Sequence, residues 1–146
     1  MISADRPFVH ANVVLLAVTD GRGGFLLTRH PEDHKFASAR GKLDLPNTEH
    51  PDDQSPEEAL ITLADKRLGS LNTHRARIIG TARNVDYYHD RKEYRDTRRV
   101  FMGLTCPDIA DITSPAGEVY TIHQLSDLKA MRDQFRRDFF LTLLEH

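Results

Sequence analysis

The N-terminal part of the chain combines a long apolar run with a glycine-rich turn. Residues 9–19 are rich in Val and Leu, the composition of a well-buried strand. Residues 20–24, Asp-Gly-Arg-Gly-Gly, tolerate the positive φ angles of a hairpin turn. The pattern therefore predicts a hairpin whose second strand covers residues 25–28.

The segments that follow show no hydrophobic period. Residues 29–42 mix charged, small, Pro and Gly residues, so we expect a long surface loop, a kind of segment that often carries function. A brief extended piece is predicted at residues 43–45, where Pro46 ends it. Residues 47–54 are polar and contain Pro51, so the pattern predicts loop there as well.

A helix is the best-defined element of the sequence. Ser55 is a suitable N-cap, Pro56 suits the first helical position, and Glu58 stands at N3, which together make a capping box. Apolar residues then recur at helical spacing, and Gly69 is placed to end the helix in a left-handed conformation. The sequence predicts a helix over about residues 56–68.

The second half of the chain predicts short strands and a helical C-terminus. Residues 76–88 are expected to form a strand and residues 89–99 a charged loop, followed by a central strand at 100–106. A further short strand is predicted at 118–122, and residues 125–146 have the apolar spacing of one or two amphipathic helices. This order of elements indicates an α+β fold, or mixed α/β sandwich.

Length and composition place these elements in a single domain over residues 1–146. With 20 basic and 22 acidic residues the formal net charge is −2, so no global positive field favours nucleic acid or anionic lipid. No apolar run reaches the roughly 18 residues of a membrane-spanning helix. No signal peptide is recognisable either. We therefore expect a soluble, cytoplasmic protein without a membrane partner.

The layout resembles the Nudix hydrolase family over nearly the whole chain, from about residue 8 to residue 144. The local cues are LDLPNT at residues 43–48, SPEEALITLADKRLGSL at 55–71 and VYTIHQLSDL at 119–128. The resemblance implies a mixed β-sheet flanked by helices, with a loop–helix–loop module after the third strand.

The metal-binding pattern of that family is degenerate in this chain. The family box is G-x5-E-x7-R-E-U-x-E-E-x-G-U, where U is aliphatic, and its glutamates hold Mg²⁺ ions that neutralise a diphosphate under attack by water. With Gly69 as the closing glycine, Lys66 and Arg67 replace the pair of metal-binding glutamates. The other differing positions are Thr48 for glycine, Gln54 for glutamate, Thr62 for arginine, Leu63 for glutamate and Ser70 for the final aliphatic residue.

These replacements decide which ligand the helix can bind. Hard divalent cations need oxygen ligands, and a helix presents such ligands together only at i, i+3 and i+4 spacing. Glu57 and Glu58 lie in the first turn, where they complement the helix dipole, so we expect no metal site on this helix. Lys66 and Arg67 either form a solvated helix face or bind an anionic phosphate directly, to which Arg67 could present a bidentate fork.

Other basic residues could also contact an anionic ligand. In the family a basic residue after the second strand often touches substrate, and Arg29 stands there, with Arg40 at the end of the same loop. The candidate ligand-binding residues are therefore Lys66, Arg67 and Arg29. Residues 72–99 carry eight basic and four acidic residues. Their tyrosines, Tyr87, Tyr88 and Tyr94, would suit stacking on a base or ribose, and the alternative is a solvated, internally salt-bridged hairpin.

Three functions follow from these patterns. The first is a Nudix-fold protein that binds a nucleotide-like or other phosphorylated ligand, or a protein partner, without efficient hydrolysis and without a cofactor. The second is a Nudix-type hydrolase of a nucleoside diphosphate derivative that uses Mg²⁺ and carboxylates from outside the helix. The third is a purely structural interaction module. We expect the first, and leave open both the identity of the ligand and a homodimer. The carboxylates of the second are Glu118, as the candidate catalytic residue, with Glu49, Asp52 and Asp53.

Overall fold

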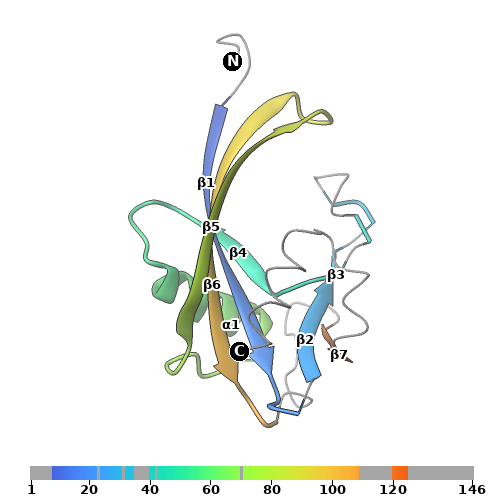
Figure 1. Ribbon diagram of the computed structural model, residues 1–146, viewed down its shortest axis with the longest axis vertical. Helices are drawn as coiled ribbons and strands as arrows, with labels where there is room; N and C mark the ends of the chain where they lie inside the picture. Colours follow the sequence, from blue (N-terminus) through green and yellow to red (C-terminus); the bar gives the residue numbers. More distant parts are fainter. Residues whose placement is uncertain are drawn as a thin grey trace.

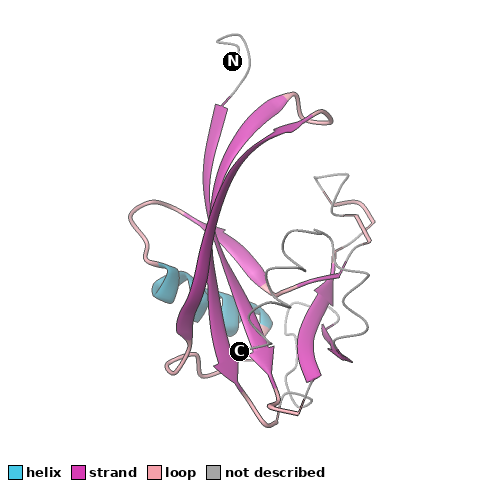
Figure 2. Ribbon diagram, viewed as in Figure 1, coloured by secondary structure: helices cyan, strands magenta, loops and turns pink. Residues whose placement is uncertain are grey.

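Seven strands form one mixed sheet, and one helix packs against it, in the part of the chain that the structure describes (Figures 1 and 2). The structure is a computed structural model that describes residues 8–22, 24–30, 32–34, 40–41, 43–69, 71–108 and 120–124. The elements are β1 (Phe8–Thr19), β2 (Gly24–Arg29), β3 (Leu43–Asp44), β4 (Asn47–His50), α1 (Pro56–Arg67), β5 (Arg77–Tyr88), β6 (Glu93–Thr105) and β7 (Tyr120–Gln124). The predicted α+β class is confirmed.

The sheet is organised around β1. Its strand order is β3-β2-β1-β6-β5, with β4 paired to β1 and β7 paired to β2. β1 runs parallel to β6 along its whole length, from Phe8 opposite Tyr94 to Thr19 opposite Thr105. Its other edge is shared, because β4 pairs antiparallel with residues 12–15 and β2 pairs antiparallel at Thr19. The turn between β3 and β4 lies where these two partners diverge, and Leu16 donates a backbone hydrogen bond to Pro46 in that turn.

The apolar run of β1 is explained by burial on both faces. Successive side chains of a strand point to opposite sides. Val14, Leu16 and Val18 join the cluster that contains the buried residues of α1. The alternate residues Val13, Leu15 and Ala17 enter a second cluster on the opposite face, which also contains Phe25, Leu27, Leu45 and Phe101.

The helix begins and ends as the sequence predicts. The side chain of Ser55 accepts a hydrogen bond from the backbone N–H of Glu58, and the Glu58 side chain accepts from the backbone N–H of Ser55, so the capping box is present. Leu68 is the C-cap, and Gly69 follows at a φ of 59°. The buried residues Ala59, Leu60, Leu63 and Ala64 hold α1 against the sheet.

Two segments predicted as loops are strands. Residues 47–54 begin with β4, because the backbone of residues 47–50 pairs with β1 even though its polar side chains suggest a loop. The predicted charged loop at 89–99 is a short turn followed by β6, which already begins at Glu93 and continues through the predicted central strand. The charged part of β6 enters the sheet because β1 and β5 pair with it on either side.

Some of the predicted features lie outside the described residues. They include Glu118 and the predicted C-terminal helices at 125–146. The strand predicted at 118–122 corresponds to β7, which is described from Tyr120 to Gln124. Within the described ranges, no helix has the length and apolar character needed to cross a membrane.

Candidate functional site

A buried carboxylate organises the turn that leads from β3 to β4. Asp44 is 1% exposed, and its oxygens accept hydrogen bonds from the backbone N–H of Leu45 at 2.8 Å and from Asn47 Nδ2 at 3.2 Å. His30 Nε2 lies 2.8 Å from Asp44 Oδ2. With its proton on Nε2, the His30 ring donates a hydrogen bond to this oxygen. The carboxylate thus anchors the end of β2 to the turn.

Arg67 connects α1 to the same turn. Its Nη1 donates a hydrogen bond to the backbone oxygen of Asn47 at 3.2 Å, and its side chain is half-buried. Asn47 Nδ2 also donates to the backbone oxygen of Leu45 at 2.7 Å. A chain of hydrogen bonds therefore runs from His30 through Asp44 and Asn47 to Arg67. This set of four residues is called the turn network below.

The other two predicted cations stand beside the turn network. Arg29 directly precedes His30, and its Nη1 donates to the backbone oxygen of Gly41 at 2.6 Å, which ties the end of β2 to the end of the following loop. The side chain of Lys66 is exposed and has no hydrogen bond or ion pair with any other described residue. The structure thus places Arg67 in the network, Arg29 next to it along the chain, and Lys66 on the neighbouring exposed side of α1.

Two of the carboxylates proposed for a displaced metal site, Glu49 and Asp52, are engaged in other contacts. Glu49 in β4 accepts a hydrogen bond from Arg95 Nη2 at 2.9 Å. Asp52 accepts one from Asn12 Nδ2 at 2.5 Å, while Asp53 is exposed. Among the described residues no group of three or more His, Cys, Asp and Glu side chains is arranged to hold a metal ion. The donor set at the helix positions, an ammonium and a guanidinium, does not fit Mg²⁺.

Asp44 and the buried charges of β6 were not identified from the sequence. Asp44 lies between Leu43 and Leu45, and Pro46 follows. An acidic residue inside such a short apolar segment is the sequence signal that could have identified it. Arg95 has a side-chain exposure of only 8% and contacts both Glu49 and, at 3.5 Å, Glu93. The salt-bridged hairpin predicted as the alternative for residues 72–99 is therefore present, but several of its charges are buried rather than solvated.

Two ring pairs bear on the remaining sequence hypotheses. Tyr87 and Tyr94 lie opposite each other on β5 and β6, with ring centroids 4.9 Å apart. Their stacking on a base or ribose stays a prediction. The rings of His30 and His34 contact each other edge to face with centroids 4.7 Å apart.

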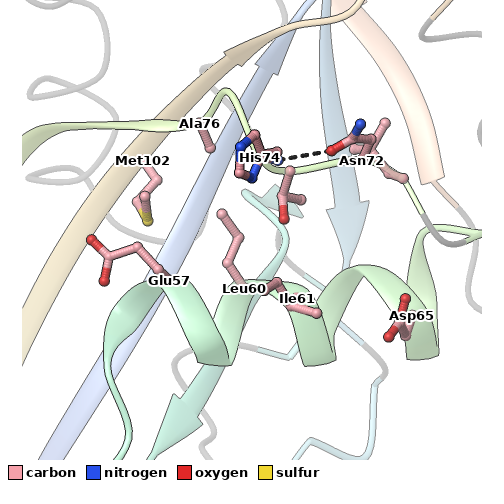
Figure 3. A pocket seen from close by; sticks show the side chains of 10 residues that line it. Glu57, Leu60, Ile61, Asp65, Asn72, His74, Ala76 and Met102 are labelled. Carbon is pink, nitrogen blue, oxygen red and sulfur yellow. Dashed lines mark hydrogen bonds between the residues drawn. The ribbon is translucent and has the colours of Figure 1, made fainter.

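A cavity of about 610 Å³ lies on another side of α1 (Figure 3). It is enclosed by the helix and by the segment that leads into β5, and neither Lys66 nor Arg67 is among its lining residues. The helix contributes Glu57, Leu60, Ile61 and Asp65, and the facing segment contributes Leu71, Asn72, Thr73, His74 and Ala76, with Met102 from β6.

Comparison with solved structures identifies the fold. A MutT protein from Methanosarcina mazei Go1 is 20% identical, with 98% of this chain and 97% of that chain covered and a TM-score of 0.67. The dihydroneopterin triphosphate pyrophosphohydrolase of E. coli is 10% identical, with 89% and 93% covered and a TM-score of 0.68. A Nudix hydrolase from M. smegmatis is 14% identical, with 94% and 84% covered and a TM-score of 0.55.

Sequence comparison gives no match to a family model or to a curated protein. The solved structures are nevertheless similar to this chain over nearly its whole length, as the sequence resemblance predicts. At these low identities the likeness is one of architecture and not of chemistry. The chain therefore has the Nudix fold.

Proposed function

We propose that the chain binds a nucleotide-like or other phosphorylated ligand beside the turn network and does not hydrolyse it efficiently. The observation that carries this proposal is the contact between Arg67 and the backbone oxygen of Asn47. It fixes a guanidinium at the position where the family box has a metal-binding glutamate. A cation held in this way can supply to a phosphate the positive charge that a metal supplies in the family.

Lys66 supplies a second cation for binding an anionic ligand. Its ammonium is exposed and has no partner among the described residues, so none of their ion pairs needs to be broken before a phosphate binds. Lysine binds phosphate as a point charge, whereas arginine adds a planar, directional pair of donors. Arg29, held at the end of β2, would contribute a third cation from the loop side.

The same residues argue against efficient hydrolysis. Lys66 and Arg67 can stabilise the negative charge that develops on a diphosphate, but they cannot take a proton from water at neutral pH. The guanidinium of arginine stays protonated in proteins. A base would have to come from another residue.

The test is a calorimetric titration of nucleoside diphosphates, nucleoside triphosphates and sugar nucleotides, each with and without Mg²⁺. Binding without Mg²⁺ is expected, and it should be weakened at least about tenfold in the double variant Lys66→Ala/Arg67→Ala. Arg98→Ala removes an exposed cation from β6 and serves as the matched control. Equal loss in the control would indicate general electrostatic attraction and would contradict the proposal.

A second candidate, a Nudix-type hydrolase of a nucleoside diphosphate derivative, is favoured by the solved structures that the fold resembles, one of which is a pyrophosphohydrolase. In this alternative Mg²⁺ would be held by carboxylates from outside the helix, namely Glu118, Glu49, Asp52 and Asp53. The assay is phosphate or nucleotide release from a broad panel of diphosphates. Turnover that requires Mg²⁺ and is abolished in Glu118→Gln would replace the binding proposal. A chain that neither binds nor hydrolyses any of these compounds would leave the structural interaction module.

A further inference from the structure

The cavity between α1 and the segment leading into β5 combines an apolar floor with carboxylates at its two ends (Figure 3). Leu60 and Met102 are almost completely buried and form the floor together with the half-buried Leu71. Ile61 borders the cavity and remains 55% exposed, so it offers apolar surface that a ligand can cover. A volume of about 610 Å³ lies in the range of sites that bind small molecules.

The two carboxylates are placed to act together on one ligand. Asp65 follows Glu57 by eight positions on the same helix, and both line the cavity on one side of it. At a rise of about 1.5 Å per residue, the two positions are about 12 Å apart along the helix axis. Leu60 and Ile61 lie between them (Figure 3). Neither carboxylate has a hydrogen bond or ion pair with any other described residue. The described lining contains no Lys or Arg.

We propose that this cavity binds a linear aliphatic polyamine, whose two terminal ammonium groups pair with Glu57 and Asp65 while its methylene chain covers Ile61 and Leu60. A chain of this kind matches the surface in both charge and polarity. Its terminal ammonium groups can span the separation of the carboxylates, and its methylenes remove apolar surface from water. An anionic or purely apolar ligand would leave both carboxylates unpaired.

This site is independent of the proposed phosphate-binding function. The cavity has no lining residue in common with the turn network, and the ligands that fit the two sites have opposite charge. The two sites can therefore be tested separately on the same protein, and loss of one does not predict loss of the other.

The experiment is a calorimetric titration of the full chain with spermidine at low ionic strength. Putrescine, which is too short to reach both carboxylates, and octylamine, which has one charge, serve as comparison ligands. Spermidine is expected to bind at one site per chain and more tightly than either. Glu57→Gln and Asp65→Asn should each weaken spermidine binding about fivefold, which is the scale of one solvent-accessible ion pair.

Glu58→Gln is the matched control. It removes the same charge from the same turn of α1, and glutamine at N3 preserves the capping box, so the helix should be unaffected. Ile61→Lys places a tethered ammonium between the two carboxylates at an exposed position and should abolish spermidine binding without unfolding the protein. The proposal is overturned if spermidine does not bind, if octylamine binds as tightly, or if Glu58→Gln weakens binding as much as Glu57→Gln.

Discussion

Arg83 of β5 holds Asp96 of β6 in a bidentate ion pair, with Nε 2.9 Å from Oδ1 and Nη2 2.7 Å from Oδ2. The side chain of Asp96 is only 2% exposed, and His10 of β1 approaches the same carboxylate at 3.2 Å. The hydrogen bonds from Arg83 hold the pKa of Asp96 below its ordinary value of 3.8, and those same bonds raise the pKa of the Arg83 guanidinium. Three strands are thereby joined through one carboxylate.

The lowered pKa predicts how the fold responds to acid. Because the pKa of Asp96 is lower in the folded chain than in the unfolded chain, its contribution to stability is complete above pH 3.8 and is lost as the pH falls through the folded value. Asp96→Asn should therefore be less stable than the wild type at pH 7, and the difference should shrink below pH 3.8. Urea denaturation across this pH range measures it. Asp108→Asn, at an exposed position, is the control, and a difference that stays constant with pH would contradict the assignment.

Leu63 tests the alignment of the helix with the family box. It stands at a position where the family has a glutamate, and here it is 2% exposed within the cluster between α1 and β1. Leu63→Ala should lower the free energy of unfolding by about 2–5 kcal/mol. Ile61→Ala, on the exposed side of the same helix, should change it by no more than about 0.5 kcal/mol. Similar effects at both positions would mean that α1 does not pack as described.

Metal binding by α1 is expected to be absent. Titration with Mn²⁺ should show no saturable site that depends on Glu57 or Glu58, since the positions that could complete a set of oxygen ligands hold Lys66 and Arg67. Calorimetry or electron paramagnetic resonance of free Mn²⁺ provides the measurement. Micromolar binding that disappears in Glu57→Gln or Glu58→Gln would show that the two cations point away from a real metal site.

Asp44 links stability to the proposed ligand site. Asp44→Ala removes the acceptor for His30, for the backbone of Leu45 and for Asn47, and should cost about 1–3 kcal/mol of unfolding free energy. It should also weaken phosphate binding, because Asn47 holds Arg67 in place. Asp44→Asn, which keeps an acceptor oxygen, should recover part of both losses. Undiminished ligand binding in a folded Asp44→Ala protein would separate the turn network from the ligand.

Local signals in the sequence were sufficient for the elements that depend on neighbours along the chain. Ser55, Pro56 and Glu58 specify the start of α1, and the apolar run of β1 reflects burial on both faces. The charged half of β6 could not be predicted in this way. Arg95 is buried, and its guanidinium pairs with Glu93 on the same strand and with Glu49, which is 46 residues away and reaches it from β4. Such partners are brought together by the tertiary fold, and composition alone indicates a solvated loop.

The candidate site also combines features that local sequence signals predict with contacts that only the tertiary fold creates. Lys66 and Arg67 were found from their spacing relative to Gly69, which is local information. The link from Arg67 to Asn47 spans 20 residues, and the link from His30 to Asp44 spans 14. The first depends on the pairing of β4 with β1, in a segment that was predicted as loop, and the second depends on the pairing of β3 with β2. Asp44 was therefore missed, although it connects the two ends of the turn network.

The parallel pairing of β1 with β6 has a consequence for the order in which the protein folds. His10 and Asp96 are register partners 86 residues apart, so a long stretch of chain must be closed before this ladder contributes any stability. β5 and β6, by contrast, are joined by a turn of only four residues, and a hairpin of this kind forms in roughly 1–10 μs. β1 then has to pair with the edge of a preformed hairpin in which residues 93–99 of β6 are mostly charged. We therefore expect the docking of β1 onto β6 to limit the refolding rate.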